Sequence, residues 1–166
     1  VKLQLTGLFN VHNALGAAAC CYGLGMDIDR IVEGLAGLTA VPGRFERVDE
    51  GQAFAVIVDY AHTPGALQNI LSAANNMPHK RLLCVMGCGG DRDRGKRPMM
   101  GKIATDICDL TFITSDNPRT EKPTAIIEDI VGGITGGRYV VEPDRHAAIV
   151  QAIGECEAGG IRGIAG

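Results

Sequence analysis

Tryptophan is absent from this sequence, and aromatic residues make up only 4% of its 166 positions. Proteins that hold single-stranded nucleic acids stack bases on aromatic side chains and attract phosphates with a basic surface. The chain offers few aromatic rings and has a formal net charge of -3. We therefore expect no nucleic-acid partner.

Long apolar runs are missing as well, because no stretch reaches the roughly 18 apolar residues that a spanning helix needs. No signal peptide is visible. The six cysteines form no C-x-x-C pair and have no histidine partners at zinc spacing, so we expect no metal site in this chain. Free thiols in apolar runs are typical of a reducing compartment. We expect a cytoplasmic protein without a membrane partner.

Two helices are expected at the start of the chain. Alanine and leucine dominate the first, from about Val11 to Tyr22. The second has an apolar face that is formed by Ile28, Ile31, Val32 and Leu35. The stretch TAVPGRFERVDEG then interrupts the helical pattern with Pro42 and Gly43, and we interpret it as a linker between two domains.

After this linker, short β-branched runs alternate with helical stretches. The expected strands are residues 54–60, 81–86, 110–115 and 138–142. The expected helices are residues 64–77, 97–108, 123–134 and 145–156. Two of these helices begin with a proline, which suits the first helical turn. The alternation predicts an α/β fold with a Rossmann-like, doubly wound, mainly parallel sheet.

Three polar motifs follow the first three predicted strands: DYAHTP, GCGGDRDRGKRP and SDNPRTEKP. Ligands of such sheets bind outside the carboxyl ends of the strands, so we expect the three motifs to share one edge. In the second motif, two glycines and Lys96 fall at the spacing of a phosphate-binding P-loop. However, Arg97 stands where that loop needs Ser or Thr, and Asp91 and Asp93 would repel a triphosphate. We predict an anion-holding loop that is not an ATP P-loop.

The third motif brings a carboxylate, an amide and a guanidinium within four residues, around Pro118. A ligand with an ammonium and a carboxylate group would be matched by Asp116 and Arg119, whose guanidinium can form two parallel hydrogen bonds. The alternative is that Asp116 and Asn117 merely form an Asx turn. The spacing alone does not decide between them.

Four other polar residues or pairs could bind a ligand, and most of them also have a simple structural or solvent-exposed alternative. Asp59 could accept hydrogen bonds from a ribose, and His62 could contact a phosphate or simply be a polar residue at a helix start. Arg44 could be carried onto a phosphate by domain motion, or could be a solvated linker arginine. Asn10 or Asn13 could cap the first helix.

Taken in order, the motifs GLFNVHNALGAAA, VPGRFE, VDYAHTPGAL, GCGGDRDRGKRPMMG, TSDNPRTEKP and DRHAAI resemble the Mur ligases of bacterial cell-wall synthesis, in particular those that add diaminopimelate. The resemblance covers nearly the whole chain. GGDRDRGKRP and DNPR are its most specific parts, whereas DYAHTP and GR.E recur with variation in relatives such as cyanophycin and folylpolyglutamate synthetases. The resemblance implies that residues 1–42 are the tail of a central ATP-binding domain and residues 43–166 an incomplete C-terminal domain. It also implies a monomer.

The resemblance further implies an ADP-forming amide ligase that uses ATP and Mg²⁺. The D-glutamyl carboxylate of the UDP-N-acetylmuramoyl dipeptide is phosphorylated, and the amine of meso-diaminopimelate then attacks the acyl phosphate. At the positions that match the family's motifs, Asn13 would contact the base of ATP, and Asp59 would lie on the ribose side of the nucleotide. Arg44 would contact the ATP phosphates, and Arg44 and His62 would have catalytic roles.

By the same resemblance, Asp116, Asn117 and Arg119 would select diaminopimelate, with Arg119 gripping its distal carboxylate. Arg92 or Arg94 would help to hold the amino acid. Two alternatives stay open: part of a lysine-adding ligase or cyanophycin synthetase, or a nucleotide-binding module without catalysis. The family's ATP P-loop and its G-K-G-H-E motif do not occur in this sequence, so we expect the isolated chain not to catalyse ligation.

Overall fold

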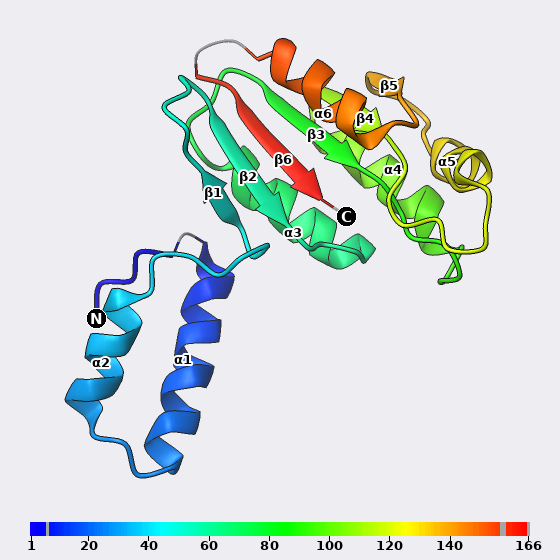
Figure 1. Cartoon of the computed structure of the whole chain (residues 1–166). Helices are drawn as coiled ribbons and strands as arrows, with labels where there is room; N and C mark the ends of the chain where they lie inside the picture. Colours follow the sequence, from blue (N-terminus) through cyan, green and yellow to red (C-terminus); the bar gives the residue numbers. More distant parts are fainter. Residues whose placement is uncertain (6, 157–158, 166) are drawn as a thin grey trace. The chain divides into compact units, whose positions relative to one another are not determined.

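The structure is a computed structural model that describes residues 1–5, 7–156 and 159–165 (Figure 1). The chain divides into two compact units, Val1–Glu46 and Arg47–Gly166. Among the described residues, none of the helices combines the length and the apolar character that crossing a membrane requires.

The first unit contains two helices, α1 (Leu8–Gly23) and α2 (Ile28–Gly37). Asp27 caps α2, because its side chain accepts a hydrogen bond from the backbone N–H of Asp29 at 2.9 Å. Helix α1 begins earlier than expected, after Gly7, with no side-chain cap. Asn10 and Asn13 therefore lie inside the helix, and the prediction that one of them caps it is wrong.

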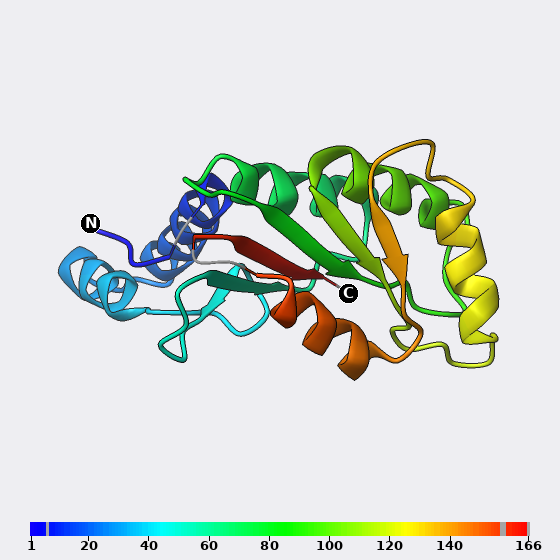
Figure 2. The same cartoon turned by 90° about the horizontal axis from the view of Figure 1, so that it is seen from above.

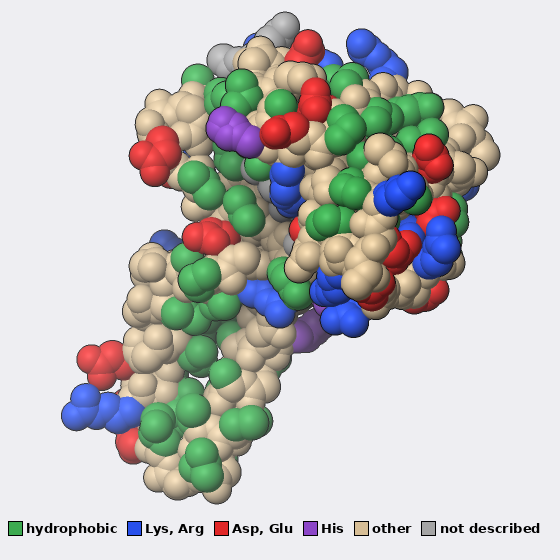
Figure 3. Space-filling view, turned by 45° about the vertical axis from the view of Figure 1, so that its right-hand side comes forward, with side chains coloured by type: hydrophobic (Ala, Val, Ile, Leu, Met, Phe, Trp, Pro, Cys, Tyr) green, Lys and Arg blue, Asp and Glu red, His purple; other side chains and the backbone are tan. Residues whose placement is uncertain are grey.

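Many large apolar side chains of this two-helix unit are exposed, as the space-filling view shows (Figure 3). They include Leu8, Val11, Leu15, Tyr22, Leu24, Met26, Ile28, Val32 and Leu38. Its buried apolar residues include Phe45, whose ring meets that of Phe9 edge-on, with centroids 5.5 Å apart. The unit thus buries only part of the apolar surface that its sequence provides.

The second unit is built on a six-stranded sheet with the order β1-β2-β6-β3-β4-β5. The strands are β1 (Glu46–Val48), β2 (Ala55–Asp59), β3 (Leu82–Met86), β4 (Leu110–Ile113), β5 (Tyr139–Val141) and β6 (Ile161–Ala165). Strand β6 lies between β2 and β3 and is parallel to both. The β3–β4 and β4–β5 pairs are parallel as well, so the predicted parallel α/β sheet is confirmed.

Helices cover both faces of this sheet. Figure 2 shows α3 (Pro64–Asn75) and α4 (Lys96–Ile107) on one face and α6 (Arg145–Gly154) on the other, with α5 (Pro123–Val131) beside α4. The doubly wound arrangement is therefore confirmed, and Pro64 and Pro123 occupy the first turns of their helices as expected. Every residue of β3 is buried, which explains its continuous apolar run. Part of the core is a cluster of Leu83, Val85, Leu110, Phe112, Ala148 and Ala152.

Two strands were not expected. Residues 46–48 fall within the stretch that we interpreted as a linker, and that interpretation is wrong for them. Strand β6 falls in the glycine-rich sequence GGIRGIAG, to which no structure was assigned. Both carry weak local signals, because β1 is only three residues long and two of them are charged, while glycine disfavours strands.

Candidate functional site

The loops that follow β2, β3 and β4 meet at one edge of the sheet and enclose a pocket of about 370 Å³. Residues from all three predicted motifs line it: Tyr60, His62, Gly89, Arg92, Lys96, Asp116, Asn117 and Arg119. The expectation that the motifs share one edge is thereby confirmed. The position follows from the parallel strands, whose carboxyl ends all point the same way.

The charges on the pocket wall are uneven. Arg92, Lys96 and Arg119 contribute cations, whereas Asp116 is the carboxylate among the lining residues. A wall of this kind matches a small ligand that carries one ammonium group and an excess of carboxylates. The amide of Asn117 adds donors and an acceptor to the same wall.

Glycines allow the loop after β3, residues 87–95, to lie directly on the loop after β4, residues 114–122. A Cβ atom on Gly87 would lie 2.7 Å from the carbonyl oxygen of Thr114, and one on Gly89 would lie 2.8 Å from Nη1 of Arg119. The backbone N–H of Gly90 donates to the carbonyl of Asn117 at 2.8 Å. The glycine-rich composition of the motif therefore serves the close approach of two loops.

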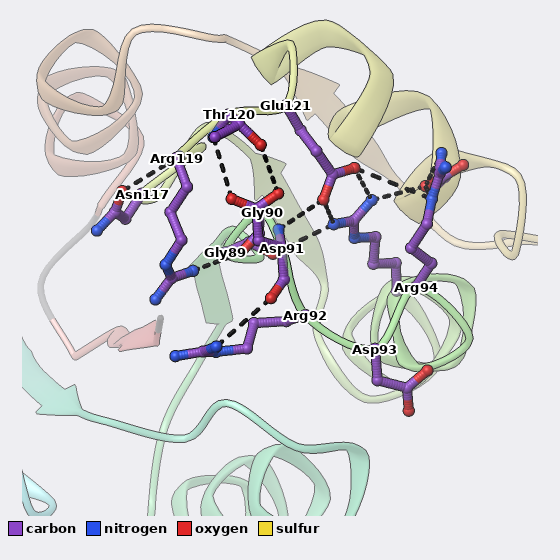
Figure 4. A network of polar contacts seen from close by, with 12 residues as sticks. Gly89, Gly90, Asp91, Arg92, Asp93, Arg94, Asn117, Arg119, Thr120 and Glu121 are labelled. Carbon is purple, nitrogen blue, oxygen red and sulfur yellow. Dashed lines mark hydrogen bonds and ion pairs between the residues drawn. The ribbon is translucent and has the colours of Figure 1, made fainter.

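Side chains also tie the two loops together (Figure 4). The carboxylate of Asp91 accepts hydrogen bonds from the hydroxyl of Thr120 at 2.7 Å and from its backbone N–H at 3.2 Å. The guanidinium of Arg119 donates to the carbonyl of Gly90. Asp91 and Arg119 both adopt positive φ, 52° and 48°, which side-chain-bearing residues rarely do. These bonds compensate for that backbone strain.

Three backbone amides of the loop after β3 bond within the protein, unlike the phosphate-binding amides of an ATP P-loop. The N–H of Asp91 donates to the carboxylate of Glu121 at 2.7 Å, and that of Gly95 donates to Asp93 at 2.9 Å. The Gly90 amide bonds to the other loop, as described above. A P-loop would instead turn such amides toward a phosphate.

An ion cluster lies behind the loops, around the fully buried Arg97 in the first turn of α4. Its guanidinium donates to Glu121 at 2.6 and 2.9 Å and to Asp129 at 2.8 Å. The bond from Arg97, with a second from the Asp91 backbone, lowers the pKa of Glu121 to about 2. The pKa of Asp129 is lowered mainly by Arg97 too, and the bond to Glu121 raises the pKa of Arg97.

Sequence reasoning did not identify this cluster. Arg97 attracted notice only as a departure from the P-loop pattern, and Glu121 and Asp129 not at all. The one usable signal was an arginine in the first turn of a helix, where a cation is disfavoured unless carboxylates compensate it. Nothing in a single sequence assigns those carboxylates to residues so far along the chain.

Five of the predicted site residues line the pocket: His62, Arg92, Asp116, Asn117 and Arg119. Arg94 is not among the lining residues, since its guanidinium forms an ion pair with Asp129 at 3.1 Å. Asn117 also accepts a hydrogen bond from the backbone N–H of Arg119 at 3.3 Å, so the Asx turn we considered is present at this residue. Turn formation and a place on the pocket wall coexist there.

The first motif is joined to the second through Lys96, whose Nζ donates to the carbonyl of His62 at 2.6 Å. The His62 ring lies 5.2 Å from that of Tyr60, measured between centroids, and its Nδ1 is 3.1 Å from the Tyr60 carbonyl. Asp59 ends β2 and is 8% exposed. It directly precedes Tyr60, which lines the pocket, but is not itself a lining residue.

The two remaining candidates, Asn13 and Arg44, belong to the first compact unit. Asn13 is exposed on α1, and its side-chain amide donates to that of Asn10 at 3.3 Å. Arg44 is exposed in the turn before Phe45, where its backbone N–H donates to Val41 at 3.0 Å. Both side chains are accessible to a ligand.

Comparison with known proteins relates this architecture to one family. The family model described as Mur ligase, glutamate ligase domain, matches residues 43–166. The chain is 49% identical over its full length to the UDP-N-acetylmuramoyl-L-alanyl-D-glutamate--2,6-diaminopimelate ligase of Solibacter usitatus. It is 52% identical over 98% of its length to the enzyme of that name from Gloeobacter violaceus. It spans 34% of each of these relatives, about a third of their length.

Solved structures give the same relationship. A structure of a UDP-N-acetylmuramoyl-L-alanyl-D-glutamate--2,6-diaminopimelate ligase is similar with a TM-score of 0.72 and 40% identity, over all of this chain and 34% of that one. E. coli FolC in complex with ADP has a TM-score of 0.72 at 23% identity, over 93% of this chain and 36% of that one, which is a likeness of fold alone. The chain thus belongs to the Mur ligase family, and its residues 43–166 match the glutamate ligase domain.

Proposed function

We propose that this chain is part of an ATP-dependent ligase that joins meso-diaminopimelate to UDP-N-acetylmuramoyl-L-alanyl-D-glutamate. The observation that carries the proposal is the pocket in which Asp116 and the guanidinium groups of Arg92 and Arg119 line one wall. The relatives at 49% and 52% identity, which bear the name of this activity, support it.

The pocket has the chemistry to hold the distal end of diaminopimelate, which carries an ammonium and a carboxylate on one carbon. Asp116 would accept hydrogen bonds from the ammonium, and Arg119 would hold the carboxylate, with Arg92 as a second cation. Lysine has the ammonium but lacks this carboxylate. Selection of diaminopimelate over lysine therefore rests on Arg119 and Arg92, with Asn117 orienting the ligand.

The reaction begins with an acyl phosphate on the D-glutamyl carboxylate and continues with attack by the diaminopimelate amine. The pocket residues orient that amine, which removes the entropic barrier of a bimolecular encounter. Arg44 would stabilise the charge on the transferring phosphoryl group, and His62 would act beside the reacting groups. Asn13 and Asp59 would contact the base and the ribose of ATP.

Mg²⁺ commonly accompanies phosphoryl transfer, where it neutralises charge on the phosphate oxygens. Among the residues that the structure describes, no group of three or more His, Cys, Asp or Glu side chains could hold a metal ion. This part of the chain does not fit a protein-built Mg²⁺ site, so we assign no Mg²⁺ ligand to it.

We further propose that residues 1–42 are the tail of a central ATP-binding domain and residues 43–166 the C-terminal domain of a cytoplasmic, monomeric enzyme. The exposed apolar side chains of α1 and α2 support this, because a complete domain would cover most of them. The length of the relatives, about three times that of this chain, is consistent with a larger protein.

Calorimetric titration of the chain with meso-diaminopimelate and with L-lysine tests the pocket. We expect selective binding of diaminopimelate, and about a 10- to 100-fold loss in the Arg119→Ala variant, since a charge-assisted hydrogen bond contributes about 1.5–3 kcal/mol. Arg47→Ala is the matched control, because it removes the same charge from a side chain that pairs with Asp49 on the surface. Equal binding of both amino acids, unaffected by Arg119→Ala, would refute the proposed specificity.

A further inference from the structure

Arg97 is fully buried, yet it does not line the pocket. Besides its bonds to Glu121 and Asp129, its Nη2 donates to the carbonyl of Gly89 at 3.3 Å. Gly89 itself lies on the pocket wall. The guanidinium therefore contacts the backbone of the loop after β3 and, through Glu121, the loop after β4.

A short chain of bonds leads from this guanidinium to the pocket cations. Glu121 accepts from the backbone N–H of Asp91, and Asp91 in turn binds Thr120 with its carboxylate. Arg119, the neighbour of Thr120, donates to the carbonyl of Gly90. Figure 4 shows Gly90, Asp91, Thr120 and Glu121 together with the side chains of Arg92 and Arg119. The orientation of Arg119 thus depends on the contact between the two loops. The guanidinium of Arg92 donates to the carbonyl of Asp91 at 3.4 Å, and Asp91 is the residue that binds the other loop.

The other side of the cluster is attached to a closely packed helix pair. Asp129 lies on α5, which packs closely against α4 at two glycines. A Cβ atom on Gly101 would lie 2.4 Å from the carbonyl oxygen of Ile130, and one on Gly133 would lie 2.1 Å from that of Pro98. Such close packing fixes the position of the first turn of α4, and with it Arg97.

A purely structural role explains this arrangement poorly. Burying a charge costs free energy, and apolar side chains of similar volume often replace buried ion pairs with no loss of stability. A guanidinium fork differs in being directional, because its N–H groups specify where each acceptor must lie. The cluster also balances its charges, since Arg94 and Arg97 face Glu121 and Asp129. Directional bonds and balanced charges are properties expected of a cluster that fixes the relative positions of the two loops.

We propose that Arg97 is a positioning residue of the pocket, which acts through Glu121 to hold the loops after β3 and β4 together so that Arg92 and Arg119 face one ligand. The identity of that ligand rests on the proposed function. The positioning itself rests on contacts within the chain. Neither Arg97 nor Glu121 is among the residues that line the pocket.

The test compares Arg97→Lys and Glu121→Gln with the control Lys102→Met. Lysine keeps the charge of Arg97 but cannot bond to Glu121 and Asp129 in a fork, and Gln keeps the shape of Glu121 without its charge. Lys102 is also on α4 and forms an ion pair with Asp106, where both side chains are about half exposed. Its loss removes an ion pair without reaching the loops.

Two quantities are measured on each variant: the Kd values of meso-diaminopimelate and L-lysine, and the hydrogen exchange rate of the Gly90 amide. We expect Arg97→Lys and Glu121→Gln to weaken diaminopimelate binding by about 10- to 100-fold, because small misplacements of binding groups have effects of this size. Binding of L-lysine should change much less, since it lacks the carboxylate that Arg119 holds. A mere loss of stability would weaken both ligands alike.

The Gly90 amide reports on the loops without any ligand, because it donates to the carbonyl of Asn117 in the other loop. Arg97 bonds to the Gly89 carbonyl of the same peptide group, so Glu121→Gln, which leaves that bond in place, is the variant that isolates the contact between the loops. Exchange of the Gly90 amide should be faster in both variants and unchanged in Lys102→Met. Faster exchange with unchanged selectivity would overturn the proposal, as would lost selectivity with unchanged exchange. If the unmodified chain binds no diaminopimelate, the proposed function fails. The exchange rate of the Gly90 amide then tests the positioning role of Arg97 by itself, and an unchanged rate in Arg97→Lys refutes that role.

Discussion

Gly90 lies so close to Pro118 that a Cβ atom built on it would be 1.9 Å from the Pro118 carbonyl oxygen. No real side chain tolerates such a contact, and the atom in the way belongs to the backbone. The loop that carries Asp116 and Arg119 therefore packs against a surface that only glycine can form. At the same contact, the backbone N–H of Gly90 donates a hydrogen bond to the carbonyl of Asn117.

Gly90→Ala should force the two loops apart, weaken binding of meso-diaminopimelate by at least about tenfold, and reduce the free energy of unfolding by about 1–3 kcal/mol, the usual effect of overpacking. Calorimetry and urea denaturation measure these two quantities.

Gly65→Ala is the matched control, since Gly65 lies in the first turn of α3 and a Cβ atom there would meet nothing within 4 Å. Alanine is the better helix former, so this variant should unfold at an equal or slightly higher urea concentration. If Gly90→Ala unfolds and binds as Gly65→Ala does, the close approach of the loops is not required.

The sheet and the shared edge of the motifs were predictable, because their signals are local and strong. Strand β3, for example, is a run of apolar residues that is buried on both faces, and such runs stand out in any sequence. Once parallel strands are assigned, topology places the residues after β2, β3 and β4 at one edge. The pocket-lining role of His62 and Arg119 follows from that placement.

Strand β6 was not predictable, since its place depends on pairing with distant strands. Cys84 of β3 pairs with Gly163, and Ile57 of β2 pairs with the same glycine from the other side. Glycine has a low preference for strands, so the local sequence argues against the structure that the two neighbours impose. The same holds for Arg97, whose partner Asp129 is separated from it by the rest of α4, a strand, two loops and most of α5.

The ion cluster predicts how stability depends on pH. Arg97 lowers the pKa of Glu121 from 4.5 to about 2 in the folded protein, so folding favours the charged carboxylate. Its contribution to the free energy of unfolding is complete above pH 4.5 and is lost as the pH falls toward 2. The Glu121→Gln variant lacks this contribution at every pH.

Urea denaturation between pH 7 and pH 2.5 should therefore show the largest difference between the parent chain and Glu121→Gln at the upper end of that range. The difference should shrink steadily below about pH 4.5. Glu128→Gln, at an exposed position of α5, is the control and should follow the parent chain. A difference that stays constant down to pH 2.5 would contradict the lowered pKa of Glu121.

The cysteines should differ sharply in reactivity. Cys84, Cys88 and Cys108 are buried free thiols, and burial raises the pKa of Cys88 to about 11, whereas Cys20 is exposed. Because the thiolate is the reactive form, iodoacetamide at pH 8 should modify Cys20 rapidly and the three buried thiols slowly. Mass spectrometry of peptides from the native chain measures this, and in urea all should react. Rapid modification of native Cys88 would show that its burial is wrong.

Asp144 caps α6, the helix that covers one face of the sheet, and the cap can be tested separately from the pocket. Its carboxylate accepts a hydrogen bond from the backbone N–H of Ala147 at 2.8 Å, which satisfies a donor that the helix itself leaves free. Asp144→Ala should lower the free energy of unfolding by about 1 kcal/mol, whereas Asp144→Asn should stay close to the parent chain, because an amide oxygen also caps. Urea denaturation at pH 7 compares the three proteins. Equal losses in both variants would mean that charge at the helix start, and not the hydrogen bond, is the stabilising factor.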